Sequence, residues 1–266
     1  MGGQGVTMNF ICQQDAIENL KLLAEHNQHG VLIVGDPGSG KTYLAKQYAG
    51  MLGITDFYKI NPVIADLKTM IDSVISSETP VVLCIENLDD GVIQAAYPLL
   101  KFIEDCPKHI YIVVTCNNYY AIPDTIPSRC ALVNINPPTS SDMEQYARSK
   151  DPTAYEFLKD KKVWKCIKGF GDVDVVLKFT PEYLKYFDNL DKLNFAKDTV
   201  SNLSWKLQHY EDKTETPLTL VVRYLMQDIS PNYRKACIEC LNALADNRIS
   251  KNAIVSKLSF DLKYTK

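Results

Sequence analysis

The chain has 266 residues, and its 29 Lys and Arg against 32 Asp and Glu give a formal net charge of −3. An apolar share of 46% with 23% charged residues is ordinary for a globular protein, which excludes wholesale disorder and collagen-like or coiled-coil rods. No apolar run approaches the roughly 20 residues of a membrane-spanning helix, and the near-neutral charge offers no global basic field for nucleic acid. We therefore expect a soluble, cytoplasmic protein of about two domains, in which any nucleic-acid contact comes from a local patch.

The first half of the chain alternates between short apolar runs and amphipathic segments. The apolar runs are typical of strands buried on both faces of a parallel sheet, and they lie at residues 31–34, 57–60, 81–85, 110–114 and 131–135. The spacing of apolar residues predicts helices at 15–25, 42–52, 67–75 and 97–103. Strands that alternate with helices in this way predict an α/β fold, a parallel sheet covered by helices on both faces.

This alternation ends at Pro137 and Pro138, and no buried strand is evident beyond them. Helical periodicity continues instead, through 140–150, 154–158, 163–168, 172–179, 181–190, 196–210, 218–226, 231–245 and 251–259. Turn-forming residues near Thr180 indicate a second boundary within this helical part. We therefore predict an α/β domain followed by an all-helical remainder.

The eight cysteines are widely dispersed, and only Cys237 and Cys240 form a C-x-x-C pair. A structural zinc site needs four ligands, usually from two such pairs, and here the second pair is missing. We interpret Cys237 and Cys240 as reduced side chains one turn apart on a helix. His26 and His29 are interpreted as residues of a helix end rather than metal ligands. Dispersed free thiols fit a reducing compartment.

A phosphate-binding pattern stands directly after the first expected strand and directly before a helix. Residues 35–42 read Gly-Asp-Pro-Gly-Ser-Gly-Lys-Thr and satisfy G-x-x-x-x-G-K-[ST]. Glycines let backbone N–H groups turn inward, and the helix N-terminus adds a favourable potential for phosphate. Lys41 is expected to reach the β- and γ-phosphates of ATP, and the Thr42 hydroxyl to bind Mg²⁺. The nucleotide-binding residues predicted here are Gly35, Pro37, Gly38, Ser39, Gly40, Lys41 and Thr42.

A P-loop ATPase also needs acidic residues at the end of a neighbouring strand, to hold Mg²⁺ and to orient the attacking water. The third expected strand is followed by Glu86, Asn87 and, two residues later, Asp89. Glu86 is well placed to bind Mg²⁺, directly or through water, but the Asn87 amide cannot accept a proton from water. This favours nucleotide binding without efficient hydrolysis, unless Asp89 or Asp90 supplies the base from a shifted register.

Further motifs resemble those of the clamp-loader subunits of the AAA+ family. Residues 128–130 read S-R-C, a motif of that family, and the phosphate loop matches its Walker A. Glu86 begins the segment where the family carries D-E-A-D, and Asn117 stands at the place of its sensor 1 residue. The segment 242–258 resembles the end of its helical collar. These motifs follow the family's order along the chain from about residue 9.

The resemblance implies a three-part chain: an AAA+ core at residues 8–137, a small helical lid at 138–179 and a helical collar at 180–266 that holds a pentameric ring together. It also implies that ATP lies between subunits, with Arg129 acting in trans on a neighbour's γ-phosphate and Asn117 serving as sensor 1. A guanidinium suits the first task because it is permanently charged and forks onto phosphate oxygens. The alternative for Arg129 is a surface arginine in a loop before a strand.

The sequence departs from the active subunits of this family at two places. Those subunits carry Asp-Glu where this chain has Glu86 and Asn87, and a lid arginine, sensor 2, where this chain has Asp174. The chain lacks both of these features but retains Walker A and Arg129, and in this combination it resembles the delta-prime or stator subunit. Many bacterial relatives insert a four-cysteine zinc module after the first core helix, but residues 50–64 hold no cysteine. The cofactors implied are therefore ATP and Mg²⁺, without zinc.

We therefore expect a subunit of an ATP-dependent sliding-clamp loader of the DNA polymerase III type, which binds nucleotide weakly or without efficient hydrolysis. The implied partners are the other subunits of a hetero-pentamer, the sliding clamp and primer-template DNA, with no membrane. Lys68 is a candidate for a DNA contact, although it also fits a solvated helix face. Residues 97–102 are candidates for a clamp contact, although their apolar side chains also fit the core. The alternatives are an autonomous AAA+ ATPase that remodels a protein or loads a helicase, and a non-catalytic nucleotide-binding scaffold outside replication.

Overall fold

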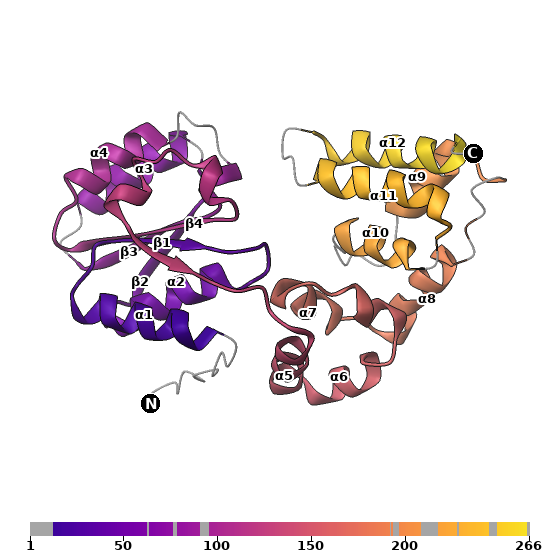
Figure 1. Ribbon diagram of the computed structural model, residues 1–266, viewed down its shortest axis with the longest axis horizontal. Helices are drawn as coiled ribbons and strands as arrows, with labels where there is room; N and C mark the ends of the chain where they lie inside the picture. The colour runs from indigo at the N-terminus through magenta and orange to yellow at the C-terminus, as the bar shows by residue number, and fades with distance from the viewer. Residues whose placement is uncertain are drawn as a thin grey trace. The chain divides into compact units, whose positions relative to one another are not determined.

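A computed structural model of the chain divides into two compact units, Met1–Tyr146 and Ala147–Lys266 (Figure 1). The structure describes residues 13–62, 64–76, 79–90, 96–191, 193, 197–208, 218–227, 229–244 and 249–264. Within these residues, no helix is long and apolar enough to cross a membrane. The first unit holds a sheet with its helices, and the second is built from helices.

The sheet of the first unit has five strands in the order β2-β3-β4-β1-β5, and every pair is parallel. The strands are β1 (Gly30–Val34), β2 (Asp56–Ile60), β3 (Val81–Ile85), β4 (Ile110–Cys116) and β5 (Ala131–Asn134). Each coincides with an expected strand to within two residues at either end. Strand β3, which lies between β2 and β4, is buried along its whole length, which explains why its sequence is a continuous apolar run.

Helices cover both faces of this sheet (Figure 1). They are α1 (Gln14–Glu25), α2 (Lys41–Met51), α3 (Ile64–Ile75) and α4 (Ala96–Glu104). Val31 and Ile33 of β1 belong to the core formed with α1 and α2, whereas Leu32 between them belongs to the core formed with α3 and α4. Strand side chains alternate between the two faces of a sheet, so each apolar residue of β1 packs against the helices on one face or the other. This confirms the prediction that helices cover both faces.

The second unit is built from helices and their connections, with no strand among its described residues. Its elements are α6 (Pro152–Leu158), η6 (Lys162–Cys166), α7 (Phe170–Val176), α8 (Pro181–Leu190), α9 (Val200–Gln208), α10 (Leu218–Met226), α11 (Pro231–Leu244) and α12 (Lys251–Tyr264), while α5 (Ser140–Lys150) spans the boundary between the units. The predicted helix at 163–168 is instead the 3₁₀ helix η6, which ends because Ile167 takes an extended backbone. Helix α12 continues five residues past its predicted end at Ser259, since Leu262 is still buried.

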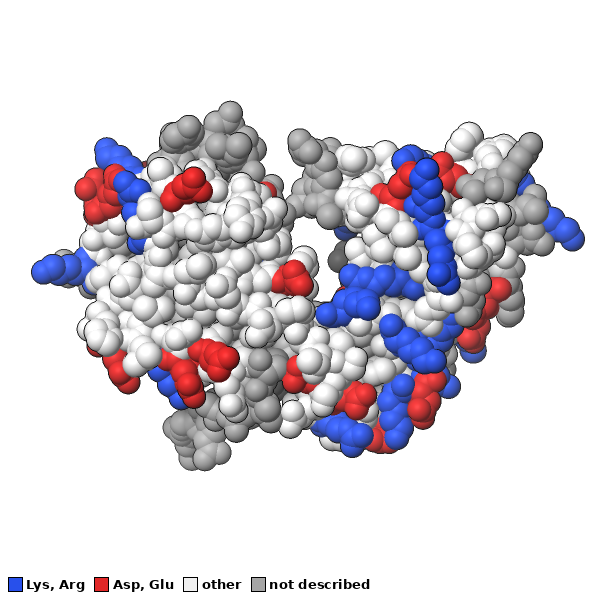
Figure 2. Space-filling view, in the orientation of Figure 1, with Lys and Arg blue, Asp and Glu red and all other residues white. Residues whose placement is uncertain are grey.

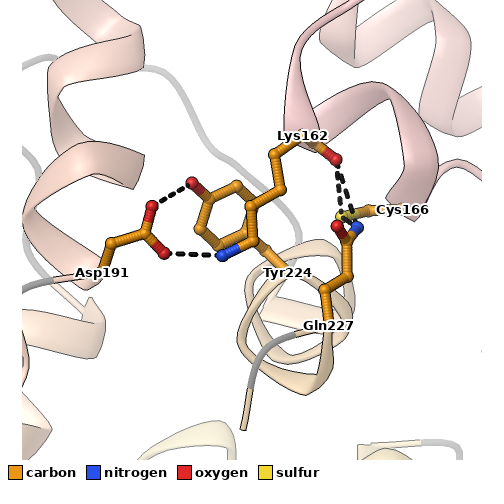
Figure 3. A network of polar contacts seen from close by, with 5 residues as sticks. All are labelled: Lys162, Cys166, Asp191, Tyr224 and Gln227. Carbon is orange, nitrogen blue, oxygen red and sulfur yellow. Dashed lines mark hydrogen bonds and ion pairs between the residues drawn. The ribbon is translucent and has the colours of Figure 1, made fainter.

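A network of polar contacts, the Asp191 cluster, joins η6, the end of α8 and α10 (Figure 3). The Asp191 carboxylate accepts hydrogen bonds from Lys162 Nζ at 2.6 Å and from the Tyr224 hydroxyl at 2.8 Å. The Lys162 ammonium also lies 4.1 Å from the centroid of the Tyr224 ring. Gln227 Nε2 donates to Lys162 O at 3.1 Å and to Cys166 Sγ at 2.8 Å. These contacts connect segments on both sides of the predicted lid–collar boundary, while the three-part division itself stays a prediction.

The cysteines and histidines singled out in the sequence have ordinary structural roles. Cys237 and Cys240 are buried free thiols on α11, as predicted. His26 caps the C-terminal end of α1, and its Nδ1 lies 2.7 Å from Leu22 O. His29, just before β1, has its Nδ1 2.8 Å from the carbonyl oxygen of Ile110 at the start of the neighbouring strand β4. Within the described part of the chain, no three His, Cys, Asp or Glu gather in a way that could hold a metal ion.

Candidate functional site

The glycine loop between β1 and α2 depends on residues without a side chain. Gly38 and Gly40 have φ of 78° and 100°, in the left-handed region that favours glycine. A Cβ on Gly35 would lie 2.3 Å from Ile135 Cγ1 of the segment after β5. Ser39 is fully buried, and its hydroxyl has no hydrogen-bond partner among the described residues. The loop is therefore tightly fitted to the carboxyl edge of the sheet.

Lys41, the first residue of α2, lies almost buried in this loop. Its ammonium donates to Gly35 O at 2.8 Å, to Asp36 O at 3.0 Å and to Asn117 Oδ1 at 2.8 Å. Asn117 directly follows β4, which pairs with β1, so parallel pairing brings both strand ends to one edge. The structure thus places the predicted phosphate-binding lysine and the predicted sensor 1 residue in direct contact.

A second contact joins the two residues predicted to bind Mg²⁺. The Thr42 hydroxyl donates to Glu86 Oε1 at 2.6 Å. Hydroxyl and carboxylate oxygens are ligands that Mg²⁺ prefers, with phosphate oxygens and water completing its shell. Lys59, near the end of β2, lies 3.5 Å from Glu86 Oε2 through its Nζ. Lys59 could not be foreseen from the sequence, because only the pairing of β2 with β3 brings it beside Glu86.

Asp89 has a structural role at this edge of the sheet. Its carboxylate accepts hydrogen bonds from the backbone N–H groups of Asn117 at 3.0 Å and Asn118 at 2.9 Å. Asp89 therefore holds the turn that presents Asn117, and this role disfavours Asp89 as the base that would activate water from a shifted register. The side chain of Asp90, the other candidate for that base, lies outside the described residues. Asn87 takes a positive φ of 48°, and its N–H donates to Thr115 Oγ1 at 2.9 Å.

Two buried thiols lie on the strands that end at this edge. Burial raises the pKa of the Cys84 thiol to about 12, with a further contribution from the Glu86 carboxylate. Burial likewise raises the pKa of the Cys116 thiol to about 11. Both side chains therefore stay neutral near pH 7, and neither is suited to act as a nucleophile.

Arg129 stands on the short 3₁₀ helix η5 (Pro127–Arg129), before β5, and is exposed. Its Nε donates to Glu104 Oε1 at 2.8 Å, and its Nη2 forms an ion pair with the same oxygen. Nη1 donates to Thr125 O at 2.9 Å and to Ser128 Oγ at 3.2 Å. The guanidinium is thus held within the chain by Glu104, Thr125 and Ser128, of which Glu104 was not foreseen from the sequence.

The structure describes some of the remaining predicted residues but not others. Asp174 Oδ1 lies 3.6 Å from Lys150 Nζ within the second unit, and its place as the lost sensor 2 stays a prediction. Leu99 and Phe102 are buried in the core, which was the alternative for residues 97–102, so these two side chains do not form a clamp contact. The side chain of Lys68 and those of residues 97 and 98 lie outside the described residues.

Comparison with solved structures decides the fold. A DNA polymerase III gamma subunit-related protein from Thermotoga maritima matches with a TM-score of 0.56 over 94% of this chain and 99% of its own, at 17% identity. The RuvB Holliday junction branch migration motor of Thermotoga maritima matches with a TM-score of 0.52 over 92% and 81%, at 16% identity. The chain has the AAA+ fold. Its α/β core and its helical C-terminal part both fall within these matches.

Sequence comparison adds relatives over parts of this AAA+ chain. The family model "DNA polymerase III, delta subunit" matches residues 54–139, and "Magnesium chelatase, subunit ChlI" matches residues 7–75. The sliding-clamp-loader large subunit of Escherichia phage RB69 is 25% identical over 175 residues, 62% of this chain. The match spans about half of that relative, 53% of its length. The chain is thus similar to clamp-loader AAA+ proteins in part of its sequence and in its fold.

Proposed function

We propose that the chain is a subunit of an ATP-dependent sliding-clamp loader in DNA replication, which binds ATP with Mg²⁺ but hydrolyses it slowly. The observation that carries the proposal is the meeting of two hydrogen-bonded pairs, Lys41 with Asn117 and Thr42 with Glu86, at one edge of the sheet. Beside them Asn87 stands where a carboxylate would activate water. The similarity to clamp-loader proteins supports the assignment.

Each residue of the site has a defined task in this proposal. The loop N–H groups and Lys41 bind the phosphates of ATP, and Asn117 orients the terminal phosphate. Thr42 and Glu86 would hold Mg²⁺, an ion that neutralises charge on phosphate oxygens when it is bound. Asn87 can donate to water or accept from it but cannot remove its proton, so turnover by this subunit is slow.

Arg129 is proposed to act in trans, on ATP held by a neighbouring subunit of a hetero-pentamer. Retention of this arginine together with Asn87 and Asp174 favours a stator role like that of delta-prime. The other clamp-loader subunits, the sliding clamp and primer-template DNA are the proposed partners. In this role the chain contributes a charge to catalysis without being an efficient ATPase itself.

The first test measures ATP affinity and turnover of the isolated chain. We expect binding that depends on Lys41, with turnover no higher than that of the Lys41→Ala variant. Ready turnover by the isolated chain would overturn the stator role and favour the autonomous ATPase. A chain that binds no ATP with or without Mg²⁺ would overturn the assignment of the nucleotide site.

The second test replaces Arg129 in the complex reconstituted with the subunits that co-purify with the chain. Arg129→Ala is expected to lower ATP turnover at the neighbouring site by about three orders of magnitude. Arg234→Ala, an exposed arginine on α11, is the matched control and should leave turnover unchanged. Equal turnover for both variants would show that Arg129 is not the finger.

A further inference from the structure

The charges of the chain are divided unequally between its two units. Residues 147–266 hold 21 of the 29 Lys and Arg but only 16 of the 32 Asp and Glu, a formal charge of +5, whereas residues 1–146 carry −8. On the face drawn in Figure 2, Lys and Arg side chains gather over the helical unit. A contact with the phosphate backbone of nucleic acid is therefore favoured in the helical unit rather than in the first unit.

The densest part of this charge lies at residues 157–168, from the end of α6 through η6. This segment contains five lysines and a single acidic residue, Asp160. Lys161, Lys165 and Lys168 are exposed. No ion pair is recorded for these three with any residue that the structure describes. We call these three lysines and Phe157 the lysine surface.

Three acidic groups near the lysine surface already have cationic partners, whereas no ion pair with a described residue is recorded for Asp160. Glu156 pairs with Lys159, and Asp191 pairs with Lys162. The Asp172 carboxylate accepts from Arg223 Nη1 at 2.7 Å and also from the backbone N–H of Lys168 at 2.8 Å. These internal pairs cancel most of the nearby negative charge, so against the single charge of Asp160 the three exposed lysines keep a net positive charge for an external anion.

Phe157 adds an aromatic group to this surface. It is 40% exposed, and Lys161 Nζ lies 5.5 Å from its ring centroid. Aromatic rings beside a line of cations are typical of proteins that bind single-stranded nucleic acid, because bases stack on the ring while lysines follow the backbone. An acidic protein partner would instead favour a larger apolar centre with arginine forks.

We propose that the lysine surface binds single-stranded nucleic acid, with Lys161, Lys165 and Lys168 on phosphates and Phe157 stacked on a base. Lysines with flexible stems bind phosphate as point charges and read no base edges, so this binding does not depend on sequence. The proposal rests on the proposed function for its setting, since it gives the DNA partner of the clamp loader a place in the helical unit.

The first experiment measures binding of a fluorescent oligothymidylate to the full chain by anisotropy, between about 50 and 200 mM salt. The triple variant Lys161→Gln, Lys165→Gln, Lys168→Gln is expected to weaken binding at least about tenfold. It should also reduce the slope of log affinity against log salt by about 2, because each contact to a single strand contributes roughly 0.7.

The matched control removes the same charge from another part of the helical unit. This control is the triple variant Lys235→Gln, Lys251→Gln, Lys257→Gln, at three lysines that are exposed on α11 and α12. We expect its affinity for oligothymidylate to change by less than about twofold, with an unchanged salt slope. Equal losses in both triple variants would mean that only net charge matters and would overturn the proposal. Absence of binding by the unmodified chain would overturn it as well.

The second experiment separates single strands from other polyanions. Phe157→Leu keeps an apolar side chain but removes the ring, and it should weaken oligothymidylate binding at least about fivefold, while Phe157→Trp retains binding. A duplex of the same length should not distinguish these variants. Poly-glutamate bound as tightly as oligothymidylate would indicate an acidic protein partner instead, and would overturn the proposal.

These results can be told apart from a failure of the proposed function. ATP affinity and the effect of Arg129→Ala are measured on the same preparations and do not involve the lysine surface. If both behave as proposed while the lysine variants bind DNA normally, only the lysine surface is wrong. If the lysine variants lose DNA but the chain binds no ATP, the proposed function is wrong and the surface stands.

Discussion

The first unit has a polar cluster at the glycine loop, formed by Ser39, Lys41 and Asn117, which we call the phosphate-loop cluster. It differs from the Asp191 cluster of the second unit in how its polar groups are satisfied. In the first, the Lys41 ammonium donates to neutral oxygens of the loop and of Asn117, and the buried Ser39 hydroxyl has no partner among the described residues. In the second, the Asp191 carboxylate accepts from both Lys162 and Tyr224. Carbonyl oxygens of the backbone and of Asn117 carry no net charge, so they leave the Lys41 ammonium suited to an anionic ligand, whereas the Asp191 carboxylate closes its network and stabilises the fold.

The strongest test of this difference removes the ammonium of the first cluster. Lys41→Ala should weaken ATP binding about 100-fold, since a charged hydrogen bond contributes about 1.5–3 kcal/mol. It should leave the free energy of unfolding of the helical unit unchanged. Calorimetric titration with ATP measures the first quantity and chemical denaturation the second. Lys46→Ala, exposed on the same helix, is the control, and a comparable loss there would contradict the assignment.

A second test uses two glycines of the first unit with opposite surroundings. Gly35→Ala should destabilise this unit by about 1–3 kcal/mol and weaken ATP binding, because its Cβ would lie 2.3 Å from Ile135 Cγ1. Gly50→Ala on α2 meets no atom within 4 Å and should instead stabilise it by about 0.5–1 kcal/mol. Thermal unfolding with and without ATP measures both. Equal effects of the two substitutions would show that the loop is not tightly fitted.

The Asp191 cluster is tested by removing one hydroxyl. Tyr224→Phe should lower the free energy of unfolding of the helical unit by about 1 kcal/mol at pH 7, with ATP affinity unchanged. Burial, and then the hydrogen bond to Asp191, raise the pKa of Tyr224 above its ordinary value. The unfolded chain therefore releases this proton first, and the stability that Tyr224 contributes is present below about pH 10 and is lost above it.

The alkaline part of this prediction has its own measurement. Denaturation curves from pH 8 to 11 should show unfolding free energy falling above about pH 10 in the natural protein, and falling less steeply in Tyr224→Phe. Tyr48, whose pKa burial also raises in the first unit, is common to both proteins and cancels in the difference. Parallel curves for the two proteins would show that the Tyr224 environment is not as described.

The two clusters also differ in how far the sequence could predict them. The glycine loop, Lys41, Thr42 and Glu86 follow from a local pattern and from strands that are apolar at every position. Lys59 and Asp89 could not be predicted, because their partners are set by strand pairing and by the turn after β4. The Asp191 cluster joins residues 29 to 65 positions apart, and no local pattern marks such contacts.

The smallest predicted effect concerns Glu104, the ion-pair partner of Arg129. Its carboxylate holds Nε and Nη2 of Arg129, while Nη1 is held by Thr125 and Ser128, so four of the five N–H groups are engaged within the chain. An exposed ion pair of this kind contributes up to about 1 kcal/mol, and under the proposed function it competes with a neighbour's γ-phosphate for the guanidinium. Glu104→Gln should therefore raise turnover of the reconstituted complex about two- to fivefold.

The control for Glu104 is its neighbour Asp105, exposed and with no recorded ion pair to any described residue. Asp105→Asn should leave turnover unchanged, and Glu104→Gln should have no effect when Arg129 is already alanine. A gain that persists without Arg129 would mean that Glu104 acts on subunit association instead of on the finger. A loss of turnover in Glu104→Gln would mean that the carboxylate aims the guanidinium at its target, because an arginine freed from competition can only bind phosphate more tightly.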